Sequence, residues 1–94
     1  MVLCDTDVII EFFKGNVSTK NILENDILPE NIALSIITLM ELYFGAKSKI
    51  EIYSKSHSLK IPDALIGATS LYYKIPLFTY NKKDFNFIKE LKLY

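Results

Sequence analysis

The sequence predicts an α/β fold, in which helices cover both faces of a parallel β-sheet of about four strands. Short apolar runs alternate along the chain with longer segments of helical pattern, an order typical of parallel strands joined by right-handed helical crossovers. Only three glycines and three prolines occur in 94 residues, and half of the residues are hydrophobic. This composition is typical of a globular domain, and we expect residues 1–94 to form a single one.

The first half of the chain contains two predicted strands. Residues 1–5, MVLCD, are an apolar run that ends in an acid, which indicates a buried strand. Residues 8–15, VIIEFFKG, have apolar side chains on several sides and close at Gly15, which predicts a short buried helix with a glycine stop. A second short helix with a polar exit is expected at 17–31, and the second strand, IALSI, at 32–36.

The second half adds two strands and several helical segments. Strands are expected at 75–80, IPLFTY, and at 91–94, LKLY. The helical segments expected here are, in chain order, 38–49 beginning at Thr38, 50–60 with a weaker pattern, 62–74, and 81–90 as a short helix or turn.

Composition excludes several kinds of site and location. Cys4 and His57 are the single cysteine and the single histidine, too few for a zinc site of the Cys/His type. No segment reaches the roughly 18–20 apolar residues of a membrane span, and Asp5 comes too early for a signal peptide. We therefore expect no membrane association and a reducing, cytoplasmic location.

The charged residues balance in number but differ in type. Eleven acids face eleven basic residues, all of them lysines. If four acids gather at one metal site, the rest of the chain carries a net charge of +4. A lysine-rich rim around an acidic centre suits a phosphate-bearing substrate that needs a metal. Lysines scattered over an ordinary solvated surface are the alternative explanation.

Four acids lie at junctions between predicted elements, and each has an ordinary structural explanation. Asp5 follows the first strand and can cap the next helix. Glu41 completes a Thr-x-x-Glu capping box. Asp63 lies in a first helical turn, where the helix dipole favours negative charge, and Asp84 lies three residues after Asn81, a candidate N-cap.

Taken together, the same four acids predict a metal site. The carboxyl ends of parallel strands lie along one edge of the sheet, where ligands bind, and all four acids are expected near that edge. Crowded carboxylates repel each other unless a cation lies between them. Carboxylate oxygens suit Mg²⁺ or Mn²⁺, which activate a water and neutralise charge on a phosphodiester. The predicted ligands are Asp5, Glu41, Asp63 and Asp84.

Neutral polar residues recur beside these acids and are candidates for holding them in place. A second layer of hydrogen bonds commonly orients the ligands of a metal. Turn and cap chemistry explains the same residues equally well. The candidates are Thr6, Ser35, Thr38, Thr79 and Asn81.

Three blocks of the sequence resemble the signature motifs of PIN-domain ribonucleases, especially the VapC-type toxins of toxin–antitoxin modules. They are LCDTDVIIEFF, ALSIITLMELYFGAK and IPDALIGATSLYYKIPLFTYNKKDF, in the family's order and over most of the chain. A lone D-T-D is a weak signal. The third block, with P-D-A-L-I followed by T-x-N-x-x-D-F, is more specific.

The resemblance implies Mg²⁺- or Mn²⁺-dependent endonucleolytic cleavage of RNA, leaving 5′-phosphate and 3′-hydroxyl ends. It puts the four acids in the positions of the family's catalytic quartet. It also implies a cognate VapB-like antitoxin that covers the active-site groove. The lysines expected to contact RNA phosphates are Lys47, Lys49, Lys82 and Lys83.

The sequence departs from the family pattern at two places. Asp7 stands where the family usually has Asn or Ser, so a fifth carboxylate lies near the metal or caps the helix. The stretch IEIYSKSHSL, residues 50–59, replaces the helical pair and edge strand of ordinary members. An uncovered sheet edge and apolar faces need protection, so we expect a shortened PIN domain that pairs as a homodimer, with or without exchange of elements.

Two alternatives to a nuclease remain open from the sequence. A strand ending in D-x-D also begins haloacid-dehalogenase-type phosphatases, in which Asp5 is the nucleophile and Asp7 the general acid. The chain is short for that fold and lacks a recognisable second aspartate motif. The other alternative is a PIN-like module that binds an antitoxin or itself without catalysis.

Overall fold

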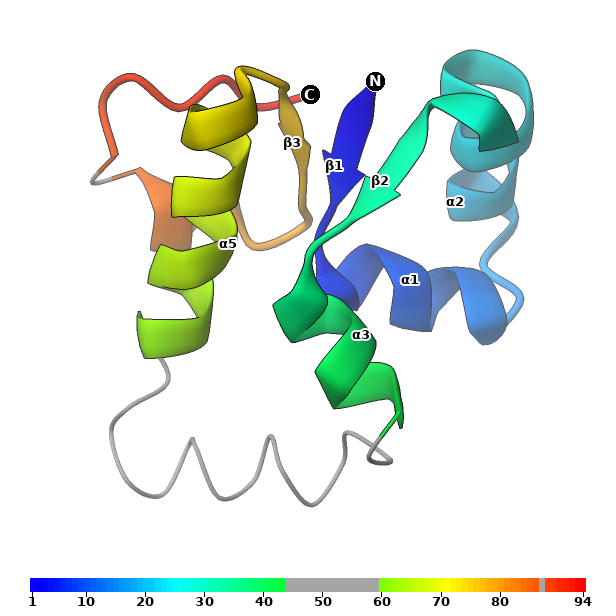
Figure 1. The fold of residues 1–94 in the computed structure, drawn as a ribbon. Coiled ribbons are helices and arrows are strands. Elements are labelled where there is room, and N and C mark those ends of the chain that lie inside the picture. Colours follow the sequence, from blue (N-terminus) through cyan, green and yellow to red (C-terminus); the bar gives the residue numbers. More distant parts are fainter. Residues whose placement is uncertain (44–59, 87) are drawn as a thin grey trace.

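A computed structural model describes residues 1–43, 60–86 and 88–94 (Figure 1). Its centre is a parallel sheet of three strands in the order β2-β1-β3, with β1 at Val2–Cys4, β2 at Ile32–Leu34 and β3 at Leu77–Phe78. Cys4 pairs with Leu34 on one side and with Phe78 on the other. The predicted parallel α/β sheet flanked by helices is confirmed.

The fourth predicted strand, at 91–94, forms only a single bridge. Leu93, which belongs to no strand, forms an isolated parallel bridge with Leu77 of β3. The Leu77 N–H donates to the Lys92 carbonyl at 2.9 Å, and the Tyr94 N–H donates to the Leu77 carbonyl at 2.8 Å. Because β3 spans two residues, it offers this segment too short an edge for a ladder. The described sheet therefore has three strands and not four.

Helix α1 spans Thr6–Phe13 and begins earlier than expected. Asp5 is its N-cap, and the Asp5 side chain accepts a hydrogen bond from the Thr6 N–H at 2.8 Å. The capping role predicted for Asp5 is confirmed. Gly15 has a φ of +86°, a backbone conformation that favours glycine, so the predicted glycine stop is confirmed as well.

The predicted helix at 17–31 is divided into three pieces. Helix α2 spans Val17–Asn21, a wider π-helical turn follows at Ile22–Ile27, and a 3-10 helix occupies Pro29–Asn31. The break lies at Leu28, which has a φ of +75°. Proline disfavours the helical conformation in the residue before it, and Pro29 therefore ends the helix at this point.

Helix α3 spans Ile36–Tyr43 and shows that the predicted capping box is wrong. Thr38 lies inside the helix and not at its start. The residue that caps α3 is Ser35, whose hydroxyl oxygen accepts the Thr38 N–H at 3.1 Å. Glu41 therefore lies in mid-helix, free of any capping role.

Helix α5 spans Lys60–Tyr73 and has Asp63 in its first turn, as predicted. It ends before Lys74, whose φ is +57°. A 3-10 helix at Lys82–Phe85 occupies part of the segment in which a short helix or turn was expected. The predictions for residues 44–59, which include the weak helix at 50–60 up to its last residue, lie outside the described residues.

The two faces of the sheet bury separate apolar clusters. Alternate residues of a strand point to opposite faces. Val2, Cys4 and Phe78 pack with residues of α1 and of the helical turns after α2, including Val8 and Leu23. On the other face, which α5 covers, the buried residues are Leu3, Ile66, Leu77 and Phe85. Figure 1 shows α5 on one side of the sheet and α1 and α2 on the other.

Among the described helices, none has the length and apolar character that a membrane crossing requires. The Cys4 thiol is fully buried in the sheet. Burial, together with the charge of Asp5, raises the pKa of this thiol to about 12. Cys4 is therefore an inert core residue and not a nucleophile or a thiolate ligand.

Candidate functional site

The carboxyl ends of the three strands point to the same side of the sheet (Figure 1). Asp5 follows β1 directly, Ser35 follows β2, and Thr79 follows β3. Helices α1 and α3 begin at this edge. We call it the acidic edge, because the carboxylates described below gather there.

Asp5 is held at the acidic edge by hydrogen bonds to both of its carboxylate oxygens. Oδ1 accepts from the Thr6 N–H at 2.8 Å, and Oδ2 accepts from the Thr79 hydroxyl at 2.7 Å. Only 5% of the Asp5 surface is exposed. Burial raises the pKa of Asp5, the hydrogen bonds from Thr79 and Thr6 lower it, and the charge of Asp84 raises it. Asp5 is thus a fixed carboxylate in a site that penalises its charge.

The pKa of Asp63 reflects its nearness to other acids. Burial is the largest cause that raises its pKa, which reaches about 7, and the charges of four further carboxylates add to it. Repulsion of this kind requires those carboxylates to lie near Asp63. They belong to three separate segments of the chain and are Asp5, Asp84, Glu41 and Asp7.

Glu41 terminates a chain of hydroxyl hydrogen bonds. Its Oε1 atom accepts from the Thr6 hydroxyl at 2.6 Å. Because Thr6 uses its proton there, the Thr38 hydroxyl donates to Thr6 at 2.9 Å, and Ser35 donates to Thr38 at 3.3 Å. Each of the three hydroxyl groups donates its single proton to the next residue, and the last acceptor is the Glu41 carboxylate. The arrangement fixes Glu41 against α1.

Asp84 is positioned by the turn after β3. The Asn81 side-chain amide donates to Asp84 Oδ2, and the Asp84 N–H donates to the Asn81 carbonyl at 3.1 Å. Asn81 in turn donates its own N–H to the Thr79 hydroxyl at 3.0 Å. Thr79 therefore connects the turn that contains Asp84 to Asp5. Asn81 precedes the 3-10 helix but makes no side-chain cap bond to its backbone.

Asp7 lies next to the same turn and is not the cap of α1. Its Oδ2 accepts the Tyr80 N–H at 3.2 Å, with the Thr79 hydroxyl at 3.5 Å. Its Oδ1 is buried without a hydrogen-bond partner. Burial and the charge of Asp5 raise the pKa of Asp7 to about 6. Asp7 is therefore a fifth carboxylate of the acidic edge.

The acids lie near one another at the acidic edge, but they do not form a preassembled set of metal ligands. Among the described side chains, no three His, Cys, Asp or Glu residues are close enough to hold a metal ion. The one ion pair among those side chains joins Lys14 and Glu11, away from this edge. Since no lysine of the described part neutralises the cluster, mutual repulsion favours separated carboxylates. Oxygen donors with uncompensated charge match the preference of a hard divalent cation.

The sequence-predicted residues are placed as follows. Each of the neutral polar candidates, Thr6, Ser35, Thr38, Thr79 and Asn81, takes part in the hydrogen-bond networks that end on the acids. Lys82 and Lys83 are exposed on the 3-10 helix beside Asp84. Lys47 and Lys49 lie outside the described residues. Sequence reasoning missed Tyr80, which lies between Thr79 and Asn81.

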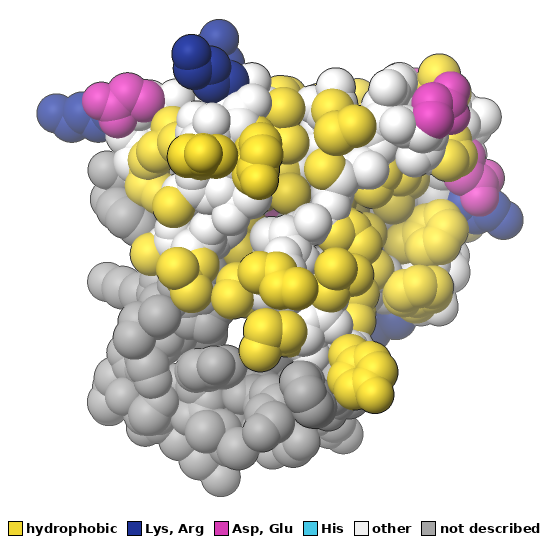
Figure 2. Space-filling view, in the orientation of Figure 1, with side chains coloured by type: hydrophobic (Ala, Val, Ile, Leu, Met, Phe, Trp, Pro, Cys, Tyr) yellow, Lys and Arg dark blue, Asp and Glu magenta, His cyan; other side chains and the backbone are white. Residues whose placement is uncertain are grey.

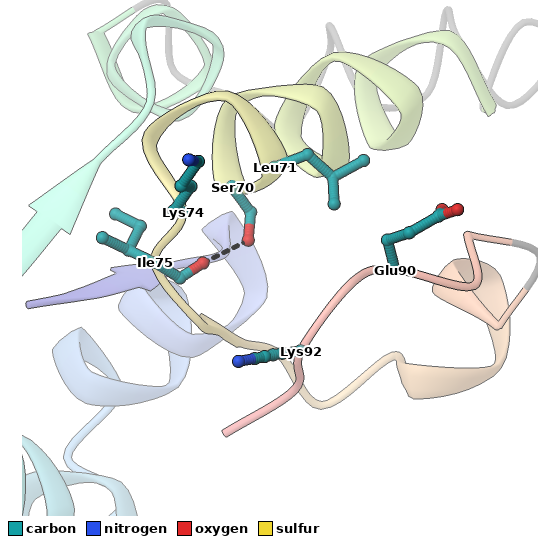
Figure 3. Close-up of a pocket in the computed structure, with 6 residues that line it drawn as sticks. All are labelled: Ser70, Leu71, Lys74, Ile75, Glu90 and Lys92. Atoms are coloured by element: carbon teal, nitrogen blue, oxygen red, sulfur yellow. Dashed lines mark hydrogen bonds between the residues drawn. The ribbon is translucent and has the colours of Figure 1, made fainter.

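A cavity of about 290 Å³ lies at the opposite end of α5 (Figure 3). In this view the Ser70 hydroxyl is turned to the Ile75 carbonyl and not to an open ligand position. No acid of the acidic edge lines this cavity, so it is separate from the candidate site. Its lining residues are Ser70, Leu71, Lys74, Ile75, Glu90 and Lys92.

Apolar side chains gather on one face of the molecule, over α3 and α5 (Figure 2). Contiguous exposed apolar surface of this kind marks an interaction site more often than ordinary surface. We call it the α3/α5 surface. Its exposed members include Ile36, Leu39, Met40, Leu65, Tyr72 and Tyr73.

The chain is similar to known proteins in both sequence and fold. Ribonuclease VapC of Rickettsia bellii (strain RML369-C) is 36% identical to it over 64 residues, a match that covers 63% of this chain and 48% of that protein. The match thus spans about half the length of this relative. A chain of a toxin-antitoxin complex from Klebsiella pneumoniae has a TM-score of 0.68 and 28% identity, covering 97% of this chain and 95% of its own. No family model matches the sequence. The predicted resemblance to VapC-type toxins is confirmed.

Proposed function

We propose that this VapC-like chain is a metal-dependent endoribonuclease that acts as the toxin of a toxin–antitoxin module. The observation that carries the proposal is the convergence of acids from distant segments at the acidic edge, where Thr79 holds Asp5 and Thr6 holds Glu41. The raised pKa of Asp63, about 7, agrees with this convergence because burial and four neighbouring carboxylates cause it. Burial and mutual repulsion of acids at the ligand-binding edge of a sheet destabilise the fold, and a bound divalent cation relieves that repulsion. The similarity to Ribonuclease VapC supports RNA as the substrate.

Asp5, Glu41, Asp63 and Asp84 are the proposed ligands of one Mg²⁺ or Mn²⁺ ion. Their donor atoms are all carboxylate oxygens, and no lysine of the described part forms an ion pair with them. When bound, a divalent ion supplies the positive charge that offsets the negative charge developing on a phosphodiester and eases deprotonation of a water. The proposed products carry 5′-phosphate and 3′-hydroxyl ends.

The chain's own residues prepare the site. Thr79 and the Thr6 N–H fix both oxygens of Asp5, so that this carboxylate needs little reorganisation. The Thr6 hydroxyl holds Glu41 in the same way from the other side. Lys82 and Lys83 are exposed beside Asp84 and offer positive charge to the flanking phosphates of RNA.

An antitoxin and a second copy of the chain are the proposed protein partners. The toxin-antitoxin complex that has a similar fold supports the first. The apolar α3/α5 surface supports both, since exposed side chains such as Ile36 and Tyr72 gain by being covered. Size-exclusion chromatography with light scattering tests the homodimer, and a folded monomer at micromolar concentration contradicts it.

RNA cleavage by the purified chain tests the proposed activity. We expect cleavage of single-stranded RNA with Mn²⁺ and none with EDTA, and we expect Glu41→Gln to abolish it. Asp26→Asn is the matched control, because Asp26 is an exposed acid outside the cluster. Metal-dependent cleavage that Glu41→Gln leaves intact contradicts the assignment of the site.

A binding module without catalysis is the second candidate. It is favoured by one observation, that no three acids of the described part approach closely enough to hold a metal. Calorimetry separates the two, because a module of this kind has no reason to bind Mn²⁺ saturably. A phosphatase is separated by Asp7→Asn, which a nuclease tolerates and a phosphatase with Asp7 as its acid does not.

A further inference from the structure

Tyr80 is an aromatic residue of the turn that follows β3 at the acidic edge, and it has no part in the proposed metal chemistry. It follows Thr79, which holds Asp5, and precedes Asn81, which holds Asp84. We propose that the Tyr80 ring is a stacking platform for one base of a single-stranded RNA substrate. This inference rests on the proposed function and adds a specific contact to it.

Tyr80 is held both at its backbone and at the tip of its ring. The ring hydroxyl forms a hydrogen bond with the Thr19 hydroxyl of α2 at 2.5 Å, and the backbone N–H donates to Asp7 at 3.2 Å. Thr19 is fully buried, so the anchor on α2 is itself fixed. A ring held in this way loses little conformational freedom when a base stacks on it, which favours binding.

The anchored ring remains open to solvent. Tyr80 is 47% exposed, whereas Phe78, two residues earlier, is 4% exposed. The two rings meet edge to face, with centroids 5.3 Å apart and an interplanar angle of 76°. A contact of this geometry covers at most one face of the Tyr80 ring. Phe78 thus acts as a buried support, and Tyr80 presents aromatic surface outward.

The neighbourhood of Tyr80 supplies what single-stranded nucleic acid binding requires. Such sites combine aromatic rings for the bases with positive charge for the backbone. The exposed lysines Lys82 and Lys83 follow Tyr80 within one turn of chain. On its other side in the chain, Thr79 holds Asp5, one of the proposed metal ligands. Aromatic surface, lysines and a proposed metal ligand are thus supplied by one short segment of chain, Thr79–Asp84.

Binding of a fluorescein-labelled single-stranded RNA tests the platform. All proteins carry Glu41→Gln and are studied with Mn²⁺, and a gel verifies that the RNA stays intact. We expect Tyr80→Leu to weaken binding about 5- to 150-fold, the range for loss of one stacked base. Tyr80→Phe keeps the ring and is expected to bind within about threefold of the parent. Phe13→Leu, which removes an exposed aromatic ring at the end of α1, is expected to have no effect.

A scan with abasic RNA identifies the stacked base, because it removes one base at a time from the RNA instead of the ring from the protein. We expect one position at which removal of the base weakens binding to the parent but not to Tyr80→Leu, since the two changes remove the same contact. The loss at this position is expected to persist at higher salt, where phosphate contacts weaken.

Three results overturn the platform. They are a Tyr80→Leu protein that binds within about twofold of the parent, a parent with no sensitive abasic position, and a parent that binds no RNA. Cleavage by the unmodified chain with Mn²⁺ is measured in parallel. If cleavage occurs while the platform fails, the proposed function stands, and absence of cleavage overturns the proposed function itself.

Discussion

Replacement of Asp63 by asparagine is expected to stabilise the metal-free chain while weakening its affinity for Mn²⁺. Asn is nearly the same size as Asp and is as good as Asp at a helix start. The substitution therefore removes a charge and little else. In the folded chain that charge is opposed by burial and by four other carboxylates. If Asp63 served only to stabilise the first turn of α5, its replacement would lower the stability of the chain instead.

The size of the effect follows from the pKa of Asp63. A rise from 3.8 to about 7 corresponds to about 4 kcal/mol of opposition to the charged form above pH 7. Asp63 is partly exposed, and solvent screening reduces this to about 1–2 kcal/mol. In a domain of this size the melting temperature is then expected to rise by about 5–10 °C. Asp63 becomes protonated in the fold below about pH 7 and in the unfolded chain below about pH 4, so the difference between the two proteins is expected to fall between these values and to vanish below about pH 4.

Thermal unfolding followed by circular dichroism measures this effect in EDTA at about pH 8 and pH 4, and again with Mn²⁺. At the higher pH we expect Asp63→Asn to melt above the parent in EDTA and to gain less from Mn²⁺. Asp26→Asn, the same change at an exposed position, is expected to alter neither. A lower melting temperature for Asp63→Asn in EDTA at the higher pH refutes the reasoning.

Three further predictions concern the surroundings of the acids and the end of α1. The pKa values of Asp7 and Asp63, about 6 and 7, lie above the ordinary 3.8, so their contribution to stability is full below about pH 4 and is lost as the pH rises to about 7. Urea unfolding in EDTA is expected to show this loss, and the double variant Asp7→Asn/Asp63→Asn is expected to reduce it; an unchanged slope contradicts the assignment. Thr79→Val removes the donor to Asp5 and the acceptor for the Asn81 N–H, and is expected to cost about 1.5–3 kcal/mol in urea unfolding, whereas Thr79→Ser retains most of the stability; equal loss in both variants argues against the hydrogen bonds. Gly15→Ala is expected to cost about 1 kcal/mol because φ at Gly15 is +86°, with a smaller loss for Gly15→Asn; an unaffected melting temperature for Gly15→Ala shows that the turn relaxes.

Local patterns were sufficient to predict the strands and most helix positions. The apolar run before Asp5 is short and ends in a polar residue, which distinguishes a strand from a buried helix. The cap at Asp5 and the stop at Gly15 follow from side-chain and backbone chemistry within a few residues. The segment at 91–94 was predicted as a strand but forms only a single bridge, because a strand also needs a partner edge, and β3 is too short to provide one.

The start of α3 shows how local signals compete. Ser35 and Thr38 both fit an N-cap, and the presence of Glu41 favoured Thr38 in the sequence. The structure uses Ser35, because β2 ends at Leu34 and leaves Ser35 as the first residue at the edge. Thr38 is then buried in the helix, where its hydroxyl joins Thr6. The end of a strand is set by pairing with β1, which a local pattern does not contain.

Contacts between distant segments could be predicted only from the expected topology of the sheet. The rule that parallel strands end at one edge predicted that Asp5, Glu41 and Asp84 lie close together. The hydrogen bond between Thr79 and Asp5 shows how distant such partners are in the chain, since 74 residues separate them. The direction of the hydroxyl chain and the unpartnered oxygen of Asp7 depend on side-chain positions that no spacing encodes. Tyr80 was missed because an aromatic residue after a buried strand resembles a core residue.

Calorimetric titration of Mn²⁺ into the purified chain tests the central claim, that acids from four segments act as one cation site. We expect saturable binding that is lost in Asp5→Asn and Asp63→Asn and retained in Asp26→Asn. Absence of saturable binding, or binding that survives both substitutions, contradicts the account.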